Sequence, residues 1–150
     1  STTKICSFWR AENIKMAIGS AHELPESLSA RVRGRDLITG LPKEIVLDDS
    51  EIRRALRHSI TTIANTVKSA VEETPPELVA DMMQRGIVLV GGGSLLKGID
   101  RLLQEETKIL VRIAEDPLTA VVRGTGIILE DIDSLKDVLV GVEREKAPIL

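Results

Sequence analysis

Aromatic residues are almost absent from this sequence. Of its 150 residues only Phe8 and Trp9 are aromatic, and there is no tyrosine. A protein that binds single-stranded nucleic acid stacks bases on aromatic side chains, and these are missing here. The formal net charge is −3, so a basic surface for nucleic acid is missing too. We therefore expect no nucleic-acid partner and a core built from Ile, Leu, Val and Ala.

Cysteine and long apolar runs are equally scarce. Cys6 is the single cysteine, which excludes a disulfide within the chain and a zinc site made of several cysteines. No apolar run reaches the roughly 18 residues that cross a bilayer. Lys4, Arg10 and Glu12 interrupt the apolar residues near the start, so the pattern of a secretory leader is missing. We expect a cytoplasmic protein.

Sequence motifs for catalysis are missing as well. The chain contains no G-x-x-x-x-G-K-[ST], no G-x-G-x-x-G and no G-x-S-x-G. His22 and His58 lie far apart in polar contexts, and we expect both to be solvated. No acidic residue stands beside a glycine-rich phosphate loop, so the chain has no means of moving a phosphoryl group. We therefore assign no catalytic residue and no metal ligand.

What the sequence does contain is centred on a glycine-rich turn. The β-branched run at residues 87–90 predicts a buried strand, and Gly91, Gly92 and Gly93 follow it directly. An apolar-periodic segment begins at Ser94 and predicts a helix over residues 94–106. Two interpretations stay open from the pattern alone. The turn either receives an anion or the polar edge of a ligand at the helix start, or it merely folds the chain tightly between packed elements.

The order of the expected elements favours an α/β fold. Strands that alternate with helices after residue 75 indicate a parallel sheet, whereas the two extended stretches before residue 48 indicate a separate antiparallel hairpin. We expect a smaller subdomain at 1–48, a larger one at 49–130 and a tail at 131–150. Expected helices cover residues 11–21, 51–73, 75–85 and 94–106 and a segment beginning at 116, and expected strands cover 28–35, 43–47, 87–90 and 109–113.

Glu12 and Lys15 lie three residues apart on the first expected helix and share one exposed side. One interpretation is a solvated surface pair that contributes a few tenths of a kcal/mol. The other is a pair of polar tips directed at a ribose or a base. The spacing by itself does not choose between them.

Several segments, in order and correctly spaced over residues 11–130, resemble MreB, the family of bacterial actin homologues. The matching segments are AENIK (11–15), IGSA (18–21), VRGRDL (32–37), TGLP (39–42), TPPEL (74–78), RGIVL (85–89), GGGSLL (91–96) and AEDPLT (114–119). The resemblance implies the C-terminal half of an actin-like (ribonuclease H-like) ATPase fold. Its parallel strands and helices are accompanied by a small subdomain with a helix and an antiparallel hairpin.

The resemblance also implies a site and a function. Members of the family polymerise with ATP into filaments under the cell membrane, where they guide cell-wall synthesis and keep rods rod-shaped. By resemblance the ATP contacts are Glu12, Asn13, Ile14, Lys15, Gly91, Gly92, Gly93, Ser94 and Leu95. The implied partners are further copies in a homopolymer and the membrane proteins of cell shape and cell-wall elongation. The implied location is the cytoplasm, at the inner face of the membrane.

Residues 1–10 do not match the family, and nothing in them supplies the phosphate-binding loops or the acid that positions water. We therefore expect adenosine contacts here, with catalysis, Mg²⁺ and membrane contact supplied by segments outside this chain. On this interpretation the glycine turn is one wall of an adenosine slot and holds no phosphate. Two alternatives are an ATPase fragment of sugar-kinase or chaperone type, which the VRGRD segment opposes, and an inactive fragment.

Overall fold

The computed structural model describes residues 8–36 and 38–132, and the side chains from Ala11 onward within those ranges. The chain begins with helix α1 (Phe8–Ile18) and an antiparallel hairpin of β1 (Ser29–Arg35) and β2 (Pro42–Asp48). Helices α2 (Asp49–Glu72) and α3 (Pro76–Arg85) follow. The remaining elements are β3 (Ile87–Leu89), the 3₁₀ helix η1 (Gly92–Leu95), α4 (Ile99–Thr107), β4 (Val111–Ile113) and α5 (Ala120–Glu130).

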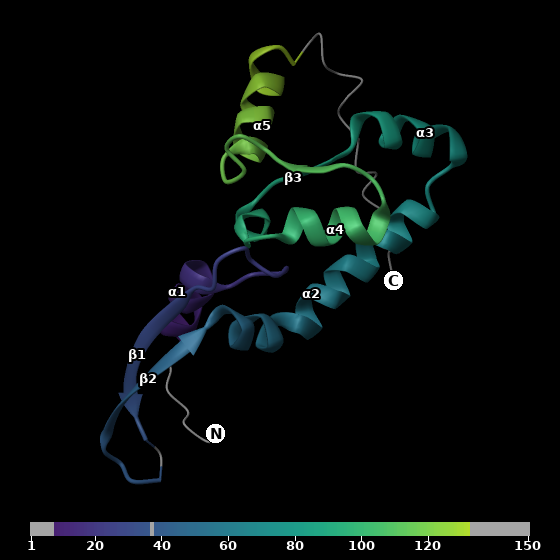
Figure 1. Ribbon diagram of the computed structural model, residues 1–150. Coiled ribbons are helices and arrows are strands. Elements are labelled where there is room, and N and C mark those ends of the chain that lie inside the picture. Colours follow the sequence, from purple (N-terminus) through teal and green to yellow (C-terminus); the bar gives the residue numbers. More distant parts are fainter. Residues whose placement is uncertain (1–7, 37, 133–150) are drawn as a thin grey trace, which may run out of the picture.

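The strands form two separate two-stranded sheets, as the sequence predicts. In the hairpin, β1 and β2 pair antiparallel over their whole length, from Ser29 opposite Asp48 to Arg35 opposite Pro42. At the other end of the molecule β3 and β4 pair parallel, with Ile87 opposite Val111. Figure 1 shows the hairpin at one end, the β3–β4 pair at the other, and the long helix α2 running between them.

Helix α2 begins where the sequence places cap-type side chains. The Asp48 carboxylate accepts a hydrogen bond from the Glu51 backbone N–H at 2.8 Å, and the Glu51 carboxylate accepts one from the Asp48 N–H at 3.2 Å. This reciprocal capping box satisfies two N–H groups that the first turn of a helix otherwise leaves without partners. The apolar stripe of α2 is packed on one side only, because Ile60 and Ala64 are buried whereas Ile63 is 49% exposed.

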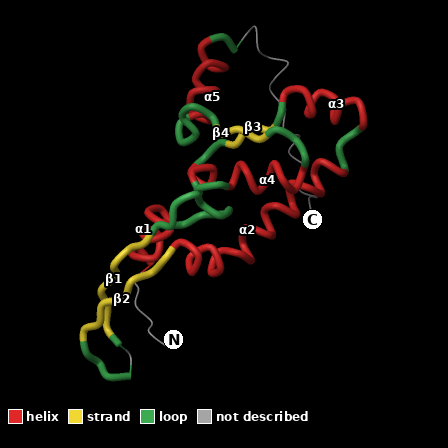
Figure 2. Tube along the Cα trace, in the orientation of Figure 1, coloured by secondary structure: helices red, strands yellow, loops and turns green. Residues whose placement is uncertain are grey.

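The core lies between α2, α4 and the β3–β4 pair. Leu103, 1% exposed, is its most buried large side chain, and Ile60 and Ala64 of α2 belong to the same cluster. Ile87 and Leu89 of β3 pack against it from the sheet side. The sheet is thus covered on the face that these residues occupy, and Figure 2 shows α4 lying along that side.

Three sequence predictions about the glycine-rich region are wrong. The turn leads into the four-residue 3₁₀ helix, so no α-helix begins at Ser94. Gly98, predicted inside that helix, instead precedes α4 with φ +74°. The strand predicted as fully buried leaves Val88 48% and Val90 47% exposed. The first two differences have one cause: a left-handed residue at 98 lets the chain change direction between η1 and α4.

Two other predictions need smaller corrections. Helix α1 starts at Phe8 and ends at Ile18, earlier at both ends than the predicted 11–21. His22 is partly buried rather than solvated, and its Nε2 lies 3.2 Å from a Glu105 carboxylate oxygen.

The interpretations of Cys6 and of residues 133–150 lie outside the described residues. Within the part of the chain that is described, every helix is too short or too polar to cross a membrane.

Candidate functional site

The polar pair on α1 is formed as predicted. Lys15 Nζ lies 2.7 Å from Glu12 Oε1, and the two side chains are 40% and 41% exposed. Each group keeps part of its hydrogen-bonding capacity, since an ammonium has three donors and a carboxylate has two oxygens. Asn13 beside them is exposed and Ile14 is half-buried. The pair can therefore offer both a donor and an acceptor to a ligand.

The glycine turn presents bare backbone. Gly91 has φ +80°, and its N–H donates to the Pro117 carbonyl at 2.6 Å. A Cβ on Gly93 would meet nothing within 4 Å, and one on Gly92 would meet only Leu118. Ser94 is buried, and its hydroxyl donates to the Gly91 carbonyl at 2.7 Å. Ser94 thus holds the turn from inside, while Gly92 and Gly93 leave room for a group to approach the backbone.

Lys97 connects this turn to α1. Its ammonium donates to the carbonyls of Met16 and Ala17 at 3.1 and 2.8 Å, at the C-terminal end of α1. Its carbonyl accepts a hydrogen bond from the Ala21 N–H at 2.8 Å. A cation is favourable at a helix C-terminus, where carbonyl groups are left without helical partners. Lys97, two residues beyond Leu95, therefore joins the two predicted halves of the site. One half lies on α1 and the other follows β3.

A buried polar cluster fixes the segment that follows α1. Arg53 Nη1 of α2 lies 2.8 Å from Ser20 Oγ, 2.8 Å from Asp49 Oδ2 and 3.3 Å from the His22 carbonyl. Ser20 is fully buried, and Asp49 is 4% exposed. Asp49 Oδ1 also accepts from the Ser27 hydroxyl. The cluster orients the α1–β1 linker on α2 and thereby fixes where α1 lies.

The hydrogen bond from Arg53 holds the pKa of Asp49 below its ordinary value. Hydrogen bonds from Ser27 and from the Leu28 N–H act in the same direction, and burial opposes them. A carboxyl whose folded-state pKa is lowered stabilises the fold above its unfolded-state pKa of about 3.9. That contribution is lost as the pH falls through the lowered folded value.

We accordingly expect the free energy of unfolding to fall as the pH drops from about 5 towards 3, and to fall less steeply in Asp49→Asn. Asparagine keeps the shape of the side chain but has no proton to gain in this range. Urea unfolding at a series of pH values measures both slopes. Equal slopes in the two proteins would show that Asp49 contributes nothing to the acid sensitivity.

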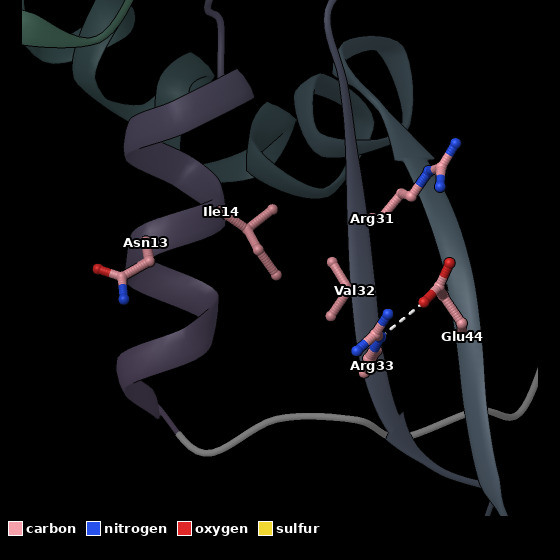
Figure 3. Close-up of a pocket in the computed structure, with 6 residues that line it drawn as sticks. All are labelled: Asn13, Ile14, Arg31, Val32, Arg33 and Glu44. Atoms are coloured by element: carbon pink, nitrogen blue, oxygen red, sulfur yellow. Dashed lines mark hydrogen bonds and ion pairs between the residues drawn. The ribbon is translucent and has the colours of Figure 1, made fainter.

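A cavity lies on another side of α1, between this helix and the hairpin. It has a volume of about 440 Å³ and is lined by Asn13, Ile14, Arg31, Val32, Arg33 and Glu44. Figure 3 shows Ile14 and Val32 pointing toward each other, and Arg33 Nε lies 2.7 Å from a Glu44 carboxylate oxygen. Of the predicted nucleotide contacts only Asn13 and Ile14 line this cavity. The cavity is thus distinct from the region between α1 and the glycine turn.

Comparison with known proteins decides the family. A family model described as MreB/Mbl protein matches residues 5–137, which corrects the expectation that the likeness begins only at residue 11. The chain belongs to the MreB/Mbl family. It is 51% identical over 123 residues to the cell shape-determining protein MreB of Escherichia coli strain K12, covering 82% of this chain and 35% of that protein. It is 47% identical over 125 residues to the cell shape-determining protein Mbl of Bacillus cereus, covering 83% and 38%. The chain thus spans little more than a third of these relatives.

Solved structures show the actin-like fold of the family. MreB5 of Spiroplasma citri bound to ADP superposes with a TM-score of 0.80 at 34% identity, over 89% of this chain and 41% of that one. The same protein bound to AMPPNP gives a TM-score of 0.78. A MamK double helical filament matches with a TM-score of 0.67 at 21% identity, which is a likeness of fold alone.

Sequence reasoning missed the residues that join the parts of this MreB/Mbl chain. The spacing of Asp49 and Arg53, four apart at the start of a helix, is a signal for an ion pair that was available. Lys97 carried a weaker signal, as a single cation next to an apolar segment and a glycine. That it reaches carbonyls some 80 residues earlier in the chain is a tertiary fact that no local pattern encodes.

Proposed function

We propose that this chain is the nucleotide-closing portion of an MreB/Mbl filament subunit and supplies the adenosine contacts of an ATP site. The contacts are Glu12, Asn13, Ile14 and Lys15 on α1, and Gly91, Gly92, Gly93, Ser94 and Leu95 at the glycine turn. The observation that carries the proposal is the link made by Lys97, which holds the end of α1 against the segment after that turn. The nucleotides bound to the solved MreB5 relative support it.

In this arrangement residues 1–48 form the smaller subdomain that closes on the nucleotide, residues 49–130 the larger one, and 131–150 a tail. Phosphate binding, the Mg²⁺ ion and hydrolysis belong to the part of the family's chain that this one does not span. Among the described residues no group of three or more His, Cys, Asp or Glu side chains is placed to hold a metal ion. We expect ATP hydrolysis to require that further part of the chain.

The biological setting that we propose is the one that the family resemblance implies. The complete subunit polymerises with ATP in the cytoplasm, at the inner face of the membrane, and guides cell-wall synthesis with the membrane proteins of cell shape and elongation. The hairpin subdomain contributes part of the contact to the next subunit. The names of the E. coli and B. cereus relatives support a role in cell shape. Family membership removes the support for a sugar-kinase or chaperone ATPase.

A binding titration tests the adenosine contacts. We expect the chain to bind adenosine and ATP with similar affinity, because it holds the nucleoside and not the phosphates. Lys15→Met should weaken the binding of adenosine and of ATP by about tenfold, which is the effect of losing one charge-assisted hydrogen bond. Lys68→Met removes an exposed lysine from α2 and is the matched control, with unchanged binding.

Three results would contradict the proposal. One is the absence of adenosine binding, and another is ATP binding that greatly exceeds adenosine binding, which would place the phosphates on this chain. The third is ATP hydrolysis above background that depends on Glu12 or Gly92. Circular dichroism of each variant shows whether lost binding reflects a lost fold.

A further inference from the structure

The linker between α1 and β1 lies against both α2 and the start of α4. The Ala21 N–H donates to the Lys97 carbonyl at 2.8 Å, and Ser20 forms a parallel bridge with Lys97. The carbonyl of His22 accepts a hydrogen bond from Arg53 Nη1 at 3.3 Å. Figure 2 shows this linker, in green, reaching toward the beginning of α4. Contacts with two different segments therefore fix the backbone from which the His22 side chain extends.

Both ring nitrogens of His22 face acceptor oxygens. Nδ1 lies 3.0 Å from the carbonyl oxygen of Glu23, and Nε2 lies 3.2 Å from a carboxylate oxygen of Glu105 on α4. A neutral imidazole has one N–H and one lone pair, so either tautomer turns a lone pair toward an oxygen and leaves one of the two contacts repulsive. An imidazolium has two N–H groups and makes both hydrogen bonds. Only the protonated ring therefore satisfies the geometry in full.

Close packing keeps His22 in this position. A Cβ built on Gly98 would lie 2.8 Å from the Cβ of His22, so the two segments approach this closely only because residue 98 is a glycine. The side chain of His22 is still 31% exposed, which gives protons from water a route to the ring. The ring is thus held in place by its neighbours and remains able to titrate.

The charged side chains that contact this linker or line the small cavity beside it come from α4, α2, the segment before α4 and the linker itself. They are Asp100, Arg101 and Glu105; Asp49 and Arg53; Lys97; and Glu23. Arg53 is paired with Asp49 at 2.8 Å, and the Lys97 ammonium is bound to carbonyls of α1. Among the described residues Glu105 is the one carboxylate within ion-pair distance of the ring. Arg101, one turn earlier on α4, is the cation placed to compete for that carboxylate.

We propose that His22 and Glu105 form a proton-dependent clasp between the α1–β1 linker and α4. With a proton bound, the ring bridges the Glu23 carbonyl and the Glu105 carboxylate and holds the linker on α4. When the proton returns to water, one of these contacts is lost, and the linker is held by its contacts with Lys97 and Arg53. Because folding brings acceptors to both nitrogens, the clasp stabilises the fold as the pH falls from about 8 to about 6. The clasp does not depend on the nucleotide contacts proposed above.

A double-mutant cycle tests the clasp in the full 150-residue chain. Urea unfolding is measured at pH 6 and at pH 8 for the original chain, His22→Gln, Glu105→Gln and the double variant. We expect the coupling between the two residues to change the unfolding equilibrium constant by about twofold to fivefold at pH 6, as for an exposed ion pair, and to vanish at pH 8. Glutamine is polar and does not titrate in this range. A general loss of stability in one variant cancels within the cycle.

His58→Gln is the matched control. His58 is the other histidine of the chain, lies exposed on α2, and its ring has no hydrogen-bond or ion-pair partner within residues 8–36 and 38–132. Its cycle with Glu105→Gln should show no coupling at either pH, and Arg101→Gln should leave the pH dependence in place. The clasp is overturned if the coupling of His22 with Glu105 is equal at the two pH values or absent at pH 6. It is also overturned if Arg101→Gln removes the pH dependence as fully as His22→Gln does.

Discussion

Leu103→Ala is expected to lower the free energy of unfolding by about 3 kcal/mol. Leu103 is 1% exposed and lies in the cluster that joins α2 and α4 to the β3–β4 pair. Truncation removes buried methyl and methylene groups and leaves a cavity that the surrounding helices fill only in part. Because a domain of this size has a total stability of only about 5 to 15 kcal/mol, the loss is a large share of it. Urea unfolding followed by circular dichroism measures the change.

Leu129→Ala is the matched control, since the same groups are removed from a side chain that is 65% exposed. We expect a change within about 0.5 kcal/mol in the isolated chain. A loss as large as that of Leu103→Ala would mean that α5 is packed in solution, against this chain or against another copy. A small loss in Leu103→Ala would show that the cluster around α4 is loosely packed.

Gly86→Ala is the second substitution with a large expected effect, a loss of about 2 to 3 kcal/mol. Gly86 has φ +78° and ψ −178°, a conformation that residues with a Cβ essentially never adopt. A Cβ built there would also lie 2.6 Å from the Leu110 carbonyl oxygen. That oxygen accepts the hydrogen bond from the Ile87 N–H at 2.7 Å that begins the pairing of β3 with β4.

Gly124→Ala provides the comparison. Gly124 lies inside α5, and a Cβ there meets nothing within 4 Å. Alanine is favoured over glycine within a helix, so we expect a gain of about 0.5 to 1 kcal/mol. Thermal unfolding of both variants shows the opposite signs directly. If Gly86→Ala were as stable as the original chain, the turn between α3 and β3 would have to adopt another conformation in solution.

Local patterns predicted most of the elements, and the reasons can be named. The apolar spacing and capping side chains of α2 predicted a helix within two residues of its ends at 49 and 72. The turn residues between β1 and β2 predicted the hairpin, and the β-branched runs predicted the parallel pair. For α2 and the hairpin turn the determining interactions lie within a few residues along the chain. The antiparallel and parallel character of the two sheets followed from the order of elements.

What local patterns missed depends on contacts between distant segments. Gly98 was predicted inside a helix because the apolar spacing continues through it. Its φ of +74° and its closeness to His22, which a Cβ would approach to 2.8 Å, arise from the packing of the α1–β1 linker. The exposure of Val88 was missed for a related reason, since an apolar run predicts a buried strand without saying what covers it. The assignment of Glu12, Lys15 and the glycines to adenosine comes from the family resemblance and stays a prediction.

Helix α2 contacts the hairpin at its beginning and α4 around Ile60 and Ala64, and it is the element that runs from one end of the molecule to the other. Its 24 residues span about 36 Å at 1.5 Å per residue. The core contact at Ile60 lies about 16 Å from the start of α2, so a tilt of about 5° there displaces the hairpin end by about 1.5 Å. In mechanical terms α2 is a lever with its fulcrum at the core. A tilt of α2 against the core is therefore transmitted to the hairpin that we expect to meet the next subunit.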